Sequence, residues 1–212
     1  MNKPSIQSTD VPAAHKIVSA TDRDIKQVCD ILGSAFSHDP VLNWLTPKAS
    51  IYSGLFRSGA EALYKKHGQV YINSDQTGAA LWLPGGISSK SPFHWRTLTT
   101  LFSILREGGL AALKRGSELE KIFAKNHPKE PHFYLHAIGA ALEHQGKGIG
   151  SALLKTGLAA CDEQGLPAYL ESTNSRNNPL YERYGFNIIG EAALSDGGPT
   201  VWFMYRDPVT PA

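Results

Sequence analysis

The chain has 212 residues, a length that suits one domain with a sizeable hydrophobic core. It carries 21 lysines and arginines against 19 aspartates and glutamates, and the net charge of +2 argues against a nucleic-acid-binding protein. Cys29 and Cys161 lie far apart in the sequence and indicate buried free thiols. Because we find no membrane-length apolar stretch and the N-terminus is too polar for a signal peptide, we expect a cytoplasmic protein with no membrane partner.

The N-terminal half predicts a strand, two amphipathic helices and a hairpin, after a flexible arm over residues 1–15. Apolar residues recur at helical spacing from Ile25 to Ala35, with Thr21 or Asp22 as the expected cap and Asp39-Pro40 as the end. The predicted elements are a strand at 16–20, helices at 25–35 and about 49–66, and hairpin strands at 69–72 and 79–83.

The C-terminal half predicts a helical insertion, followed by strands that alternate with helices. The insertion covers residues 87–128 and contains two helical runs joined at Gly108-Gly109. In chain order, the predicted elements are helices at about 95–106 and 110–125, a strand at 132–141, a helix at 148–164, a strand at 168–173, a short helix at 179–184, closing strands at 187–190 and 200–205, and a tail at 207–212.

A glycine-rich turn, Gln145-Gly146-Lys147-Gly148-Ile149-Gly150, joins a predicted strand to a predicted helix. Glycines lack the Cβ atoms that keep a bound group away from the main chain, and the helix dipole adds positive potential, so the turn suits phosphate or pyrophosphate. A Walker loop is excluded because Gly148 follows the lysine, and the dinucleotide fingerprint is excluded because its third glycine position holds Ser151. Taken alone, the glycines could simply shape the strand-to-helix turn.

Further segments accompany this turn, namely a preceding strand, the strand Ala168–Thr173 and the motif Pro179-Leu-Tyr181-Glu-Arg-Tyr-Gly185-Phe186. In their order and spacing they resemble the acetyl-CoA-binding core of the GNAT superfamily of N-acetyltransferases. Within that superfamily, the chain is most similar to the puromycin N-acetyltransferase group. That similarity rests on four segments, Pro128–Pro131, His144–Gly148, Leu170–Thr173 and Arg176–Phe186.

The resemblance implies a mixed α/β (α+β) fold, with a mostly antiparallel central sheet flanked by helices. It implies one acetyltransferase domain over residues 16–206, with the helical insertion before the fourth core strand, and a chain that acts as a monomer or homodimer. Acetyl-CoA is the implied cosubstrate, and no metal is implied.

In the resembling family, the strand before the turn bulges away from its neighbour, and its main chain pairs with the thioester and pantetheine. Gly139 would permit such a bulge. Many relatives have an Asp-Pro or Ser-Pro step where this chain has Ala141-Leu142, which leaves the exit of the loop open. The residues expected to contact acetyl-CoA are Ile138, Gly139, Ala140, Gln145, Gly146, Lys147, Gly148, Ile149, Gly150, Ser151, Asn177 and Tyr181.

Acetyl transfer to an amine requires a group that takes a proton from nitrogen and a group that protonates the departing sulfur. Tyr181 matches the family tyrosine whose hydroxyl commonly acts as the acid. Glu171 is the first candidate for the base, because a carboxylate in an apolar strand is costly to bury unless it is paired or functional. The structural alternative is an ion pair between Glu171 and Arg176 or Arg183. His136, water or an amine that enters neutral are the alternatives to Glu171 as base.

The acceptor side of the site is assigned to the first helices and the insertion. Aromatic residues and one carboxylate could form the walls and the counter-charge for an amine, namely Phe36, Asp39, Trp44, Trp82 and Trp95. The leading hypothesis is transfer of an acetyl group to a primary amine of a small molecule, with an amine-bearing antibiotic such as puromycin as one candidate. The alternatives are a protein or peptide N-acetyltransferase and a non-catalytic acyl-CoA-binding module.

Overall fold

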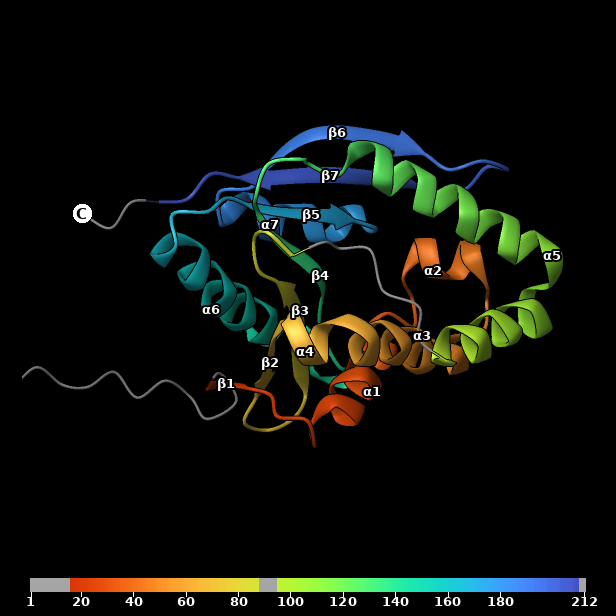
Figure 1. The fold of residues 1–212 in the computed structure, drawn as a ribbon, viewed down its shortest axis with the longest axis horizontal. Helices are drawn as coiled ribbons and strands as arrows, with labels where there is room; N and C mark the ends of the chain where they lie inside the picture. The colour runs from red at the N-terminus through yellow and green to blue at the C-terminus, as the bar shows by residue number, and fades with distance from the viewer. Residues whose placement is uncertain (1–15, 88–94, 210–212) are drawn as a thin grey trace, which may run out of the picture.

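The computed structural model describes residues 16–87 and 95–209, which form one twisted sheet with helices on both faces (Figure 1). The N-terminal arm at 1–15, residues 88–94 of the insertion and the end of the tail at 210–212 lie outside the described residues. Seven strands follow the order β1-β2-β3-β4-β5-β7-β6. Their bounds are β1 Ile17–Ser19, β2 Gln69–Asn73, β3 Gly78–Leu83, β4 Phe133–Ala140, β5 Ala168–Ser172, β6 Asn187–Ala193 and β7 Thr200–Arg206.

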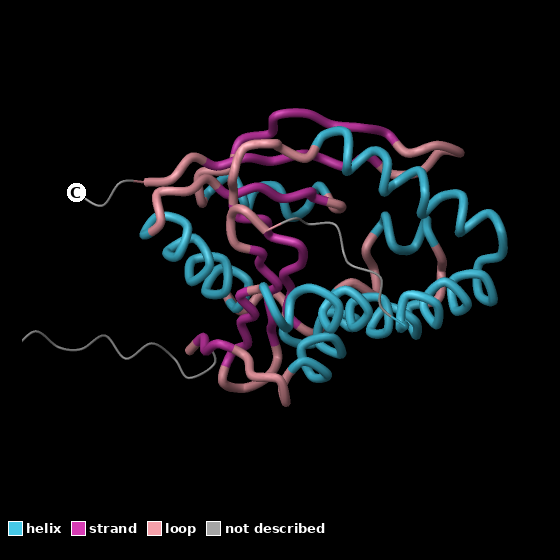
Figure 2. Tube along the Cα trace, viewed as in Figure 1, coloured by secondary structure: helices cyan, strands magenta, loops and turns pink. Residues whose placement is uncertain are grey.

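All neighbouring strands pair antiparallel except β4 and β5, which run parallel. This mixed sheet confirms the predicted fold class. Helices on either side appear in cyan in Figure 2, with most of them gathered beyond one face of the sheet. Their bounds are α1 Ile25–Ala35, α2 Pro40–Leu45, α3 Tyr52–Gly59, α4 Lys65–His67, α5 Trp95–Asn126, α6 Ile149–Glu163 and α7 Asn178–Arg183, with short turns η2 Ala49–Ile51, η3 Ala60–Tyr64, η4 Leu142–His144 and η5 Ser175–Asn177.

The start of α1 differs from the sequence prediction. Asp24 is its N-cap residue, and the Asp24 carboxylate accepts hydrogen bonds from the backbone and hydroxyl of Thr21 at 2.7 Å each. Neither Thr21 nor Asp22 caps the helix, because the carboxylate of Asp24 stabilises the preceding turn instead. The predicted end near Asp39-Pro40 is also the start of a further helix, α2, in which Asp39 is the N-cap and proline occupies the first turn.

Two irregularities shape the helical layer that covers the cavity described below. The second predicted helix is continuous through a π-helical turn, Ala60–Tyr64, between α3 and α4. The two predicted runs of the insertion form α5, with a break at Gly109, whose φ of 66° and ψ of −166° are not helical. That conformation is open mainly to glycine, so Gly109 sets the angle between the two halves of α5.

The strand β4 contains a β-bulge, but not where the sequence suggested. Leu81 pairs with Ala137 and Trp82 pairs with Leu135, so His136 is the extra residue on β4. Gly139 pairs in regular register with Ala79. A Cβ atom at Gly139 would lie 2.6 Å from the Cβ of Ala35, and this glycine therefore permits close packing of α1.

The sheet separates two hydrophobic cores. One core lies under α1 to α5 and includes Tyr134, Ala137 and Tyr169. The other lies under α6 and α7 and includes Trp82 and Leu170. Successive residues of β5, such as Tyr169 and Leu170, therefore face opposite layers, as the period of two in a strand requires.

Candidate active site

A cavity of about 320 Å³ lies on the sheet face that α1, α2, α3 and α5 cover. Its lining combines an apolar helical wall with a polar wall from the ends of β4 and β5 and the start of α7. The lining residues are Phe36, Asp39, Val41, Leu42, Leu45, Leu55, Phe56, Leu119, Phe123, Tyr134, Leu135, His136, Ala137, Ile138, Leu170, Glu171, Thr173, Asn177 and Tyr181.

In the polar wall, the carboxylate of Glu171 has the most unusual surroundings. Its side chain is 4% exposed, and among the described residues its buried Oε1 atom has no hydrogen-bond partner. This oxygen makes an ion-pair contact with Nδ1 of His127, at 3.5 Å. The alternative predicted from the sequence, an ion pair with Arg176 or Arg183, does not form within the described chain. A buried carboxylate oxygen without a donor is costly, and such groups concentrate at functional sites.

His136 stands beside Glu171 in the same wall, at the bulge of β4. Its Nδ1 atom lies 3.4 Å from the hydroxyl of Tyr134, and its ring stacks on Tyr64 with centroids 5.1 Å apart. Surrounding protein desolvates the imidazole and lowers its pKa below the ordinary value, while the ring surface toward the cavity stays accessible. A neutral imidazole at this position can accept a proton or a hydrogen bond.

Tyr181 lies in α7 and reaches the same cavity from the opposite core. The residue is 7% exposed, and its ring packs edge-on against Phe186 with centroids 6.1 Å apart. Burial, with a smaller contribution from the charge of Asp39, raises the pKa of its hydroxyl above the ordinary value. The group therefore carries its proton at neutral pH, as a general acid must.

Asp39 lines the cavity, but its carboxylate is already occupied. One oxygen caps α2 by accepting from the amides of Val41 and Leu42 at 3.0 and 2.9 Å, and the other accepts from the hydroxyl of Thr173. Burial raises the pKa of this carboxyl, while those hydrogen bonds oppose the shift. We conclude that Asp39 joins α2 to the end of β5, and its expected role as a counter-charge for an amine stays a prediction.

Two of the aromatic residues expected at the acceptor side lie outside the cavity lining. Trp82 is fully buried in the opposite core, where a Cβ atom at Gly157 would lie 2.3 Å from its ring. Trp44 donates from Nε1 to the carbonyl of Ser195 at 3.2 Å, and Arg115 covers its ring at 5.3 Å. These tryptophans are structural. The side chain of Trp95 lies outside the described part of the chain, whereas Phe36 lines the cavity as expected.

The glycine-rich turn adopts the geometry that its composition predicted. Gly146 and Gly148 have φ values of 75° and 82°, and Gly148 is the N-cap residue of α6. The side chain of Gln145 donates to the carbonyls of Ala35 and Ala140, each at 3.3 Å, and so fixes the turn to α1 and β4. The amides of the first turn of α6 stay available for an anion, because a helix cannot satisfy them itself.

A gap in strand pairing connects this turn with the cavity. β4 and β5 pair only from Phe133 to Leu135 on β4 and from Ala168 to Leu170 on β5. Beyond these residues β4 continues to Ala140 and β5 to Ser172, with no further pairs between them in the described chain. The backbone edge of β4 from Ile138 to Ala140 therefore faces a separation between strands that can admit an extended ligand.

Some lining residues were not predicted from the sequence. Leu119 and Phe123 come from the insertion, where their spacing of four on an amphipathic helix was the available signal. Tyr134 belongs to the alternating run His132, Tyr134 and His136 in the strand before the turn, which places aromatic and imidazole side chains on one face of that strand. That these residues line one cavity depends on contacts between segments that are remote in sequence.

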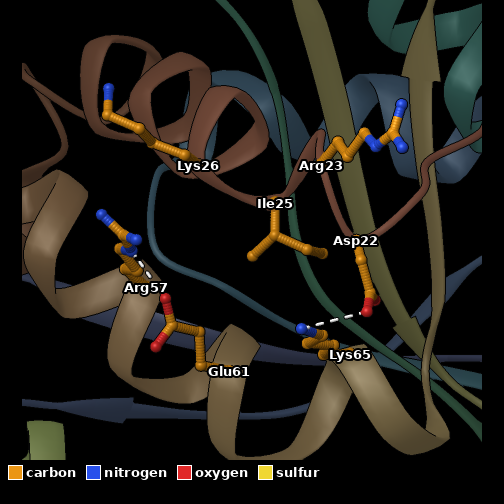
Figure 3. Close-up of a pocket in the computed structure, with 7 residues that line it drawn as sticks. All are labelled: Asp22, Arg23, Ile25, Lys26, Arg57, Glu61 and Lys65. Carbon is orange, nitrogen blue, oxygen red and sulfur yellow. Dashed lines mark hydrogen bonds and ion pairs between the residues drawn. The ribbon is translucent and has the colours of Figure 1, made fainter.

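A second pocket of about 340 Å³ lies on the outer side of α1 and α3, and Figure 3 shows its charged lining. Two ion pairs lie in its lining: Arg57 pairs with Glu61 at 2.7 Å, and Lys65 pairs with Asp22 at 3.0 Å. Ion pairs of this kind near the surface contribute little to the free energy of folding, and they do not bring reactive groups together.

Within the described residues, no cluster of three or more histidine, cysteine, aspartate or glutamate side chains could hold a metal ion. The helices of the same residues include none with the length and apolar character needed to cross a bilayer.

The comparisons with known proteins agree with this geometry. A family model described as the acetyltransferase (GNAT) family matches residues 81–186. An uncharacterised N-acetyltransferase of Schizosaccharomyces pombe is 30% identical over 211 residues, which span 89% of this chain and 81% of the relative. The chain belongs to the GNAT family. As a GNAT N-acetyltransferase it is an acyl-transferring enzyme of a family that uses acetyl-CoA in general.

Solved GNAT structures share this fold over most of their length. A structure from Corynebacterium glutamicum, titled as histone acetyltransferase HPA2 and related acetyltransferase, has a TM-score of 0.65 and 26% identity, covering 93% of this chain and 98% of that chain. Arylalkylamine N-acetyltransferase 2 from Aedes aegypti has a TM-score of 0.60 and 13% identity, covering 91% and 98%. The second likeness is one of fold alone.

Proposed function

We propose that this GNAT enzyme transfers an acetyl group from acetyl-CoA to the primary amine of a small molecule with an apolar body. The observation that carries the proposal is the buried Glu171 carboxylate, whose Oε1 atom has no hydrogen-bond partner among the described residues, in the wall of an otherwise largely apolar cavity that Tyr181 also lines. This combination supplies a proton acceptor for nitrogen and a proton donor for sulfur around one enclosed space.

The donor is proposed to extend from the helix α6 to the cavity. Its pyrophosphate would accept hydrogen bonds from the amides between Gln145 and Ser151, where glycines keep side chains away and the helix dipole favours negative charge. Its pantetheine would pair with the exposed edge of Ile138, Gly139 and Ala140, with Asn177 on the facing side of the opening.

The reaction would proceed by direct attack of the amine nitrogen on the thioester carbonyl. A bond forms between nitrogen and the acetyl carbon, Glu171 takes one proton from nitrogen, and the carbon–sulfur bond then breaks. Tyr181 gives its proton to the departing sulfur. Transfer of one proton from Glu171 back to the tyrosinate restores both groups, so that acetyl amide and CoA thiol are the products.

The cavity favours a compact acceptor over a polypeptide. Its helical wall consists of Val41, Leu42, Leu45, Leu55, Phe56, Leu119 and Phe123 together with Phe36. Apolar walls with a few polar groups at one end are typical of small-molecule sites, in which burial of the body provides affinity and the polar end fixes orientation. An arylalkyl amine or an aminonucleoside meets both requirements.

The proposal is tested by measuring thiol release from acetyl-CoA with a panel of acceptors. The panel contains arylalkyl amines, aminoglycosides, puromycin and peptides with free N-termini or lysines. Puromycin is included because the motif from Arg176 to Phe186 resembles that of puromycin N-acetyltransferases. We expect turnover with small apolar amines; turnover confined to peptides would support a protein N-acetyltransferase, and acetyl-CoA binding without any turnover would support a binding module.

Replacing Tyr181 with phenylalanine should lower turnover by roughly tenfold to a thousandfold, because the ring contact with Phe186 remains while the acid is lost. Acetyl-CoA affinity, measured by calorimetry, should change little. Phe186→Leu serves as a control for altered packing in the same core and should leave most of the turnover intact. Unchanged turnover of the Tyr181 variant under chemistry-limited conditions would assign the tyrosine to packing alone.

The proposal extends to the organisation of the protein. Residues 16–206, with the insertion at 87–128, would act as one domain between an arm at 1–15 and a tail at 207–212. We place this domain in the cytoplasm, where acetyl-CoA is available, as a monomer or homodimer without nucleic-acid partners.

A further inference from the structure

Behind Glu171, away from the cavity, lies a pair of histidines that the reaction described above does not use. His127 directly follows the last residue of α5, and its Nδ1 atom lies 3.5 Å from Oε1 of Glu171. Its Nε2 atom lies 3.2 Å from Nε2 of His132, and Nδ1 of His132 lies 2.7 Å from the carbonyl oxygen of Glu130. These contacts form a continuous chain from the cavity carboxylate to the main chain.

The donor and acceptor roles along this chain of contacts determine which nitrogen atoms carry protons. A carbonyl oxygen only accepts, so Nδ1 of His132 must carry a proton and, in the neutral ring, Nε2 is an acceptor. The facing Nε2 atom of His127 must then donate. A neutral His127 consequently presents an unprotonated Nδ1 atom to Glu171, and two acceptors face each other unless one proton lies between them.

We propose that Glu171 and His127 share the proton that Glu171 takes from an incoming ammonium group, and that His127 is the positioning residue through which this proton leaves the cavity. The inference deepens the proposed function and rests on it. An amine that enters as an ammonium ion must lose one proton before it can attack. That proton would pass from nitrogen to Glu171 and on to Nδ1 of His127, whose side chain is 20% exposed and can release it to solvent.

The other titratable groups around this pair support a single shared proton. Burial raises the pKa of Tyr64 from η3, Tyr134 from β4 and Tyr169 from β5, so these phenols are neutral near pH 7. Burial lowers the pKa of His132 and of His136, which are then also neutral.

The charge of the remaining titratable neighbour, Glu130, acts on His132, where it opposes the lowering of the pKa by burial. Among the described residues, the ion-pair contact of Glu171 is with His127 and not with an arginine or lysine, which favours a proton exchanged between the two over a permanent ion pair.

The test that needs no acetyl transfer is nitrogen-15 NMR of histidine in the full chain, recorded over a pH series. In the unmutated protein we expect His132 as the Nδ1–H tautomer and a single titration for the pair. In Glu171→Gln, loss of the carboxylate should lower the apparent pKa of His127 by about one unit or more, since an opposite charge at this range favours the protonated ring. An unchanged titration of His127 would overturn the proposal.

The kinetic test compares His127→Gln and His127→Phe with the unmutated enzyme over the same pH range. Phenylalanine keeps the edge contacts that the ring makes with Tyr134 and Tyr169, at centroid distances of 5.0 and 5.1 Å. Either change removes the acceptor of the shared proton, so the acid limb of kcat/KM should move to lower pH by about one unit or more. A folded variant with an unmoved limb would contradict the relay.

The two proposals fail differently. An unmutated enzyme that shows the expected histidine titration but acetylates no amine would contradict the proposed function and leave the shared proton in place. An active enzyme whose His127 titrates independently of Glu171 would retain the proposed function and lose the relay.

Discussion

Glu171→Gln should lower turnover with a small amine by roughly a hundredfold to ten-thousandfold, the contribution expected of a positioned general base. Glutamine keeps the size of the side chain and cannot accept the proton from nitrogen. The active form of the enzyme has the base deprotonated, so activity of the unmutated enzyme rises with pH as the base loses its proton. In the variant this acid limb should disappear, which a pH series of kcat/KM would show.

Asp39→Asn is the matched control, because Asp39 is a second carboxylate in the lining of the same cavity. Asparagine is also a good N-cap residue, and its side-chain oxygen can replace the one that accepts from Val41 and Leu42. This variant should retain the acid limb. If Glu171→Gln kept full turnover at saturating substrate, His136 or a water molecule would have to be the base.

Gly148→Val should abolish measurable binding of acetyl-CoA. Gly148 has a φ of 82° at the start of α6, and a β-branched residue in this left-handed conformation is strained by about 1–2 kcal/mol. Its side chain would also stand beside the amides that are proposed to bind pyrophosphate. Calorimetry with acetyl-CoA measures the effect, and circular dichroism verifies that the variant is folded.

Gly165→Val separates backbone strain from loss of the anion site. Gly165 lies just beyond the other end of α6, with a φ of 63° and open space around its Cβ position. The strain is therefore similar, whereas the amides at the start of the helix are untouched. We expect this control to lose stability but to bind acetyl-CoA normally. Equal affinities for both valine variants would place the pyrophosphate elsewhere.

The features of the fold that the sequence predicted are those encoded within short segments. Apolar spacing located α1 and α6, and the glycines from Gln145 to Gly150 located the turn that precedes α6. At Asp39-Pro40 we predict from the sequence the end of the first helix, but not the start of another helix. The same pair is an N-cap followed by proline, which is an equally local signal for the start of α2.

Features that depend on distant contacts could not be predicted in the same way. The bulge at His136 follows from the register between β3 and β4, and no single strand determines its partner's register. Tryptophan is a common residue type in binding sites, which makes Trp82 and Trp44 candidates from the sequence. In the structure Trp82 is buried against Gly157 and Trp44 contacts Arg115, so both have structural roles. His127 lies close to Glu171 because the end of α5 contacts β5, although the two residues are 44 positions apart in the sequence.

The division of the molecule into two cores by its sheet bears on how such an enzyme can change. Residues such as Leu119 and Phe123 meet the acceptor cavity from one layer, whereas Leu153 of α6 and Trp82 of β3 belong to the core of the other. Substitutions in the first layer can thus change the shape of the cavity without disturbing the packing behind the glycine-rich turn. A library directed at the inner faces of α2, α3 and α5 should yield altered acceptor preferences at a higher rate than random mutagenesis of the whole chain.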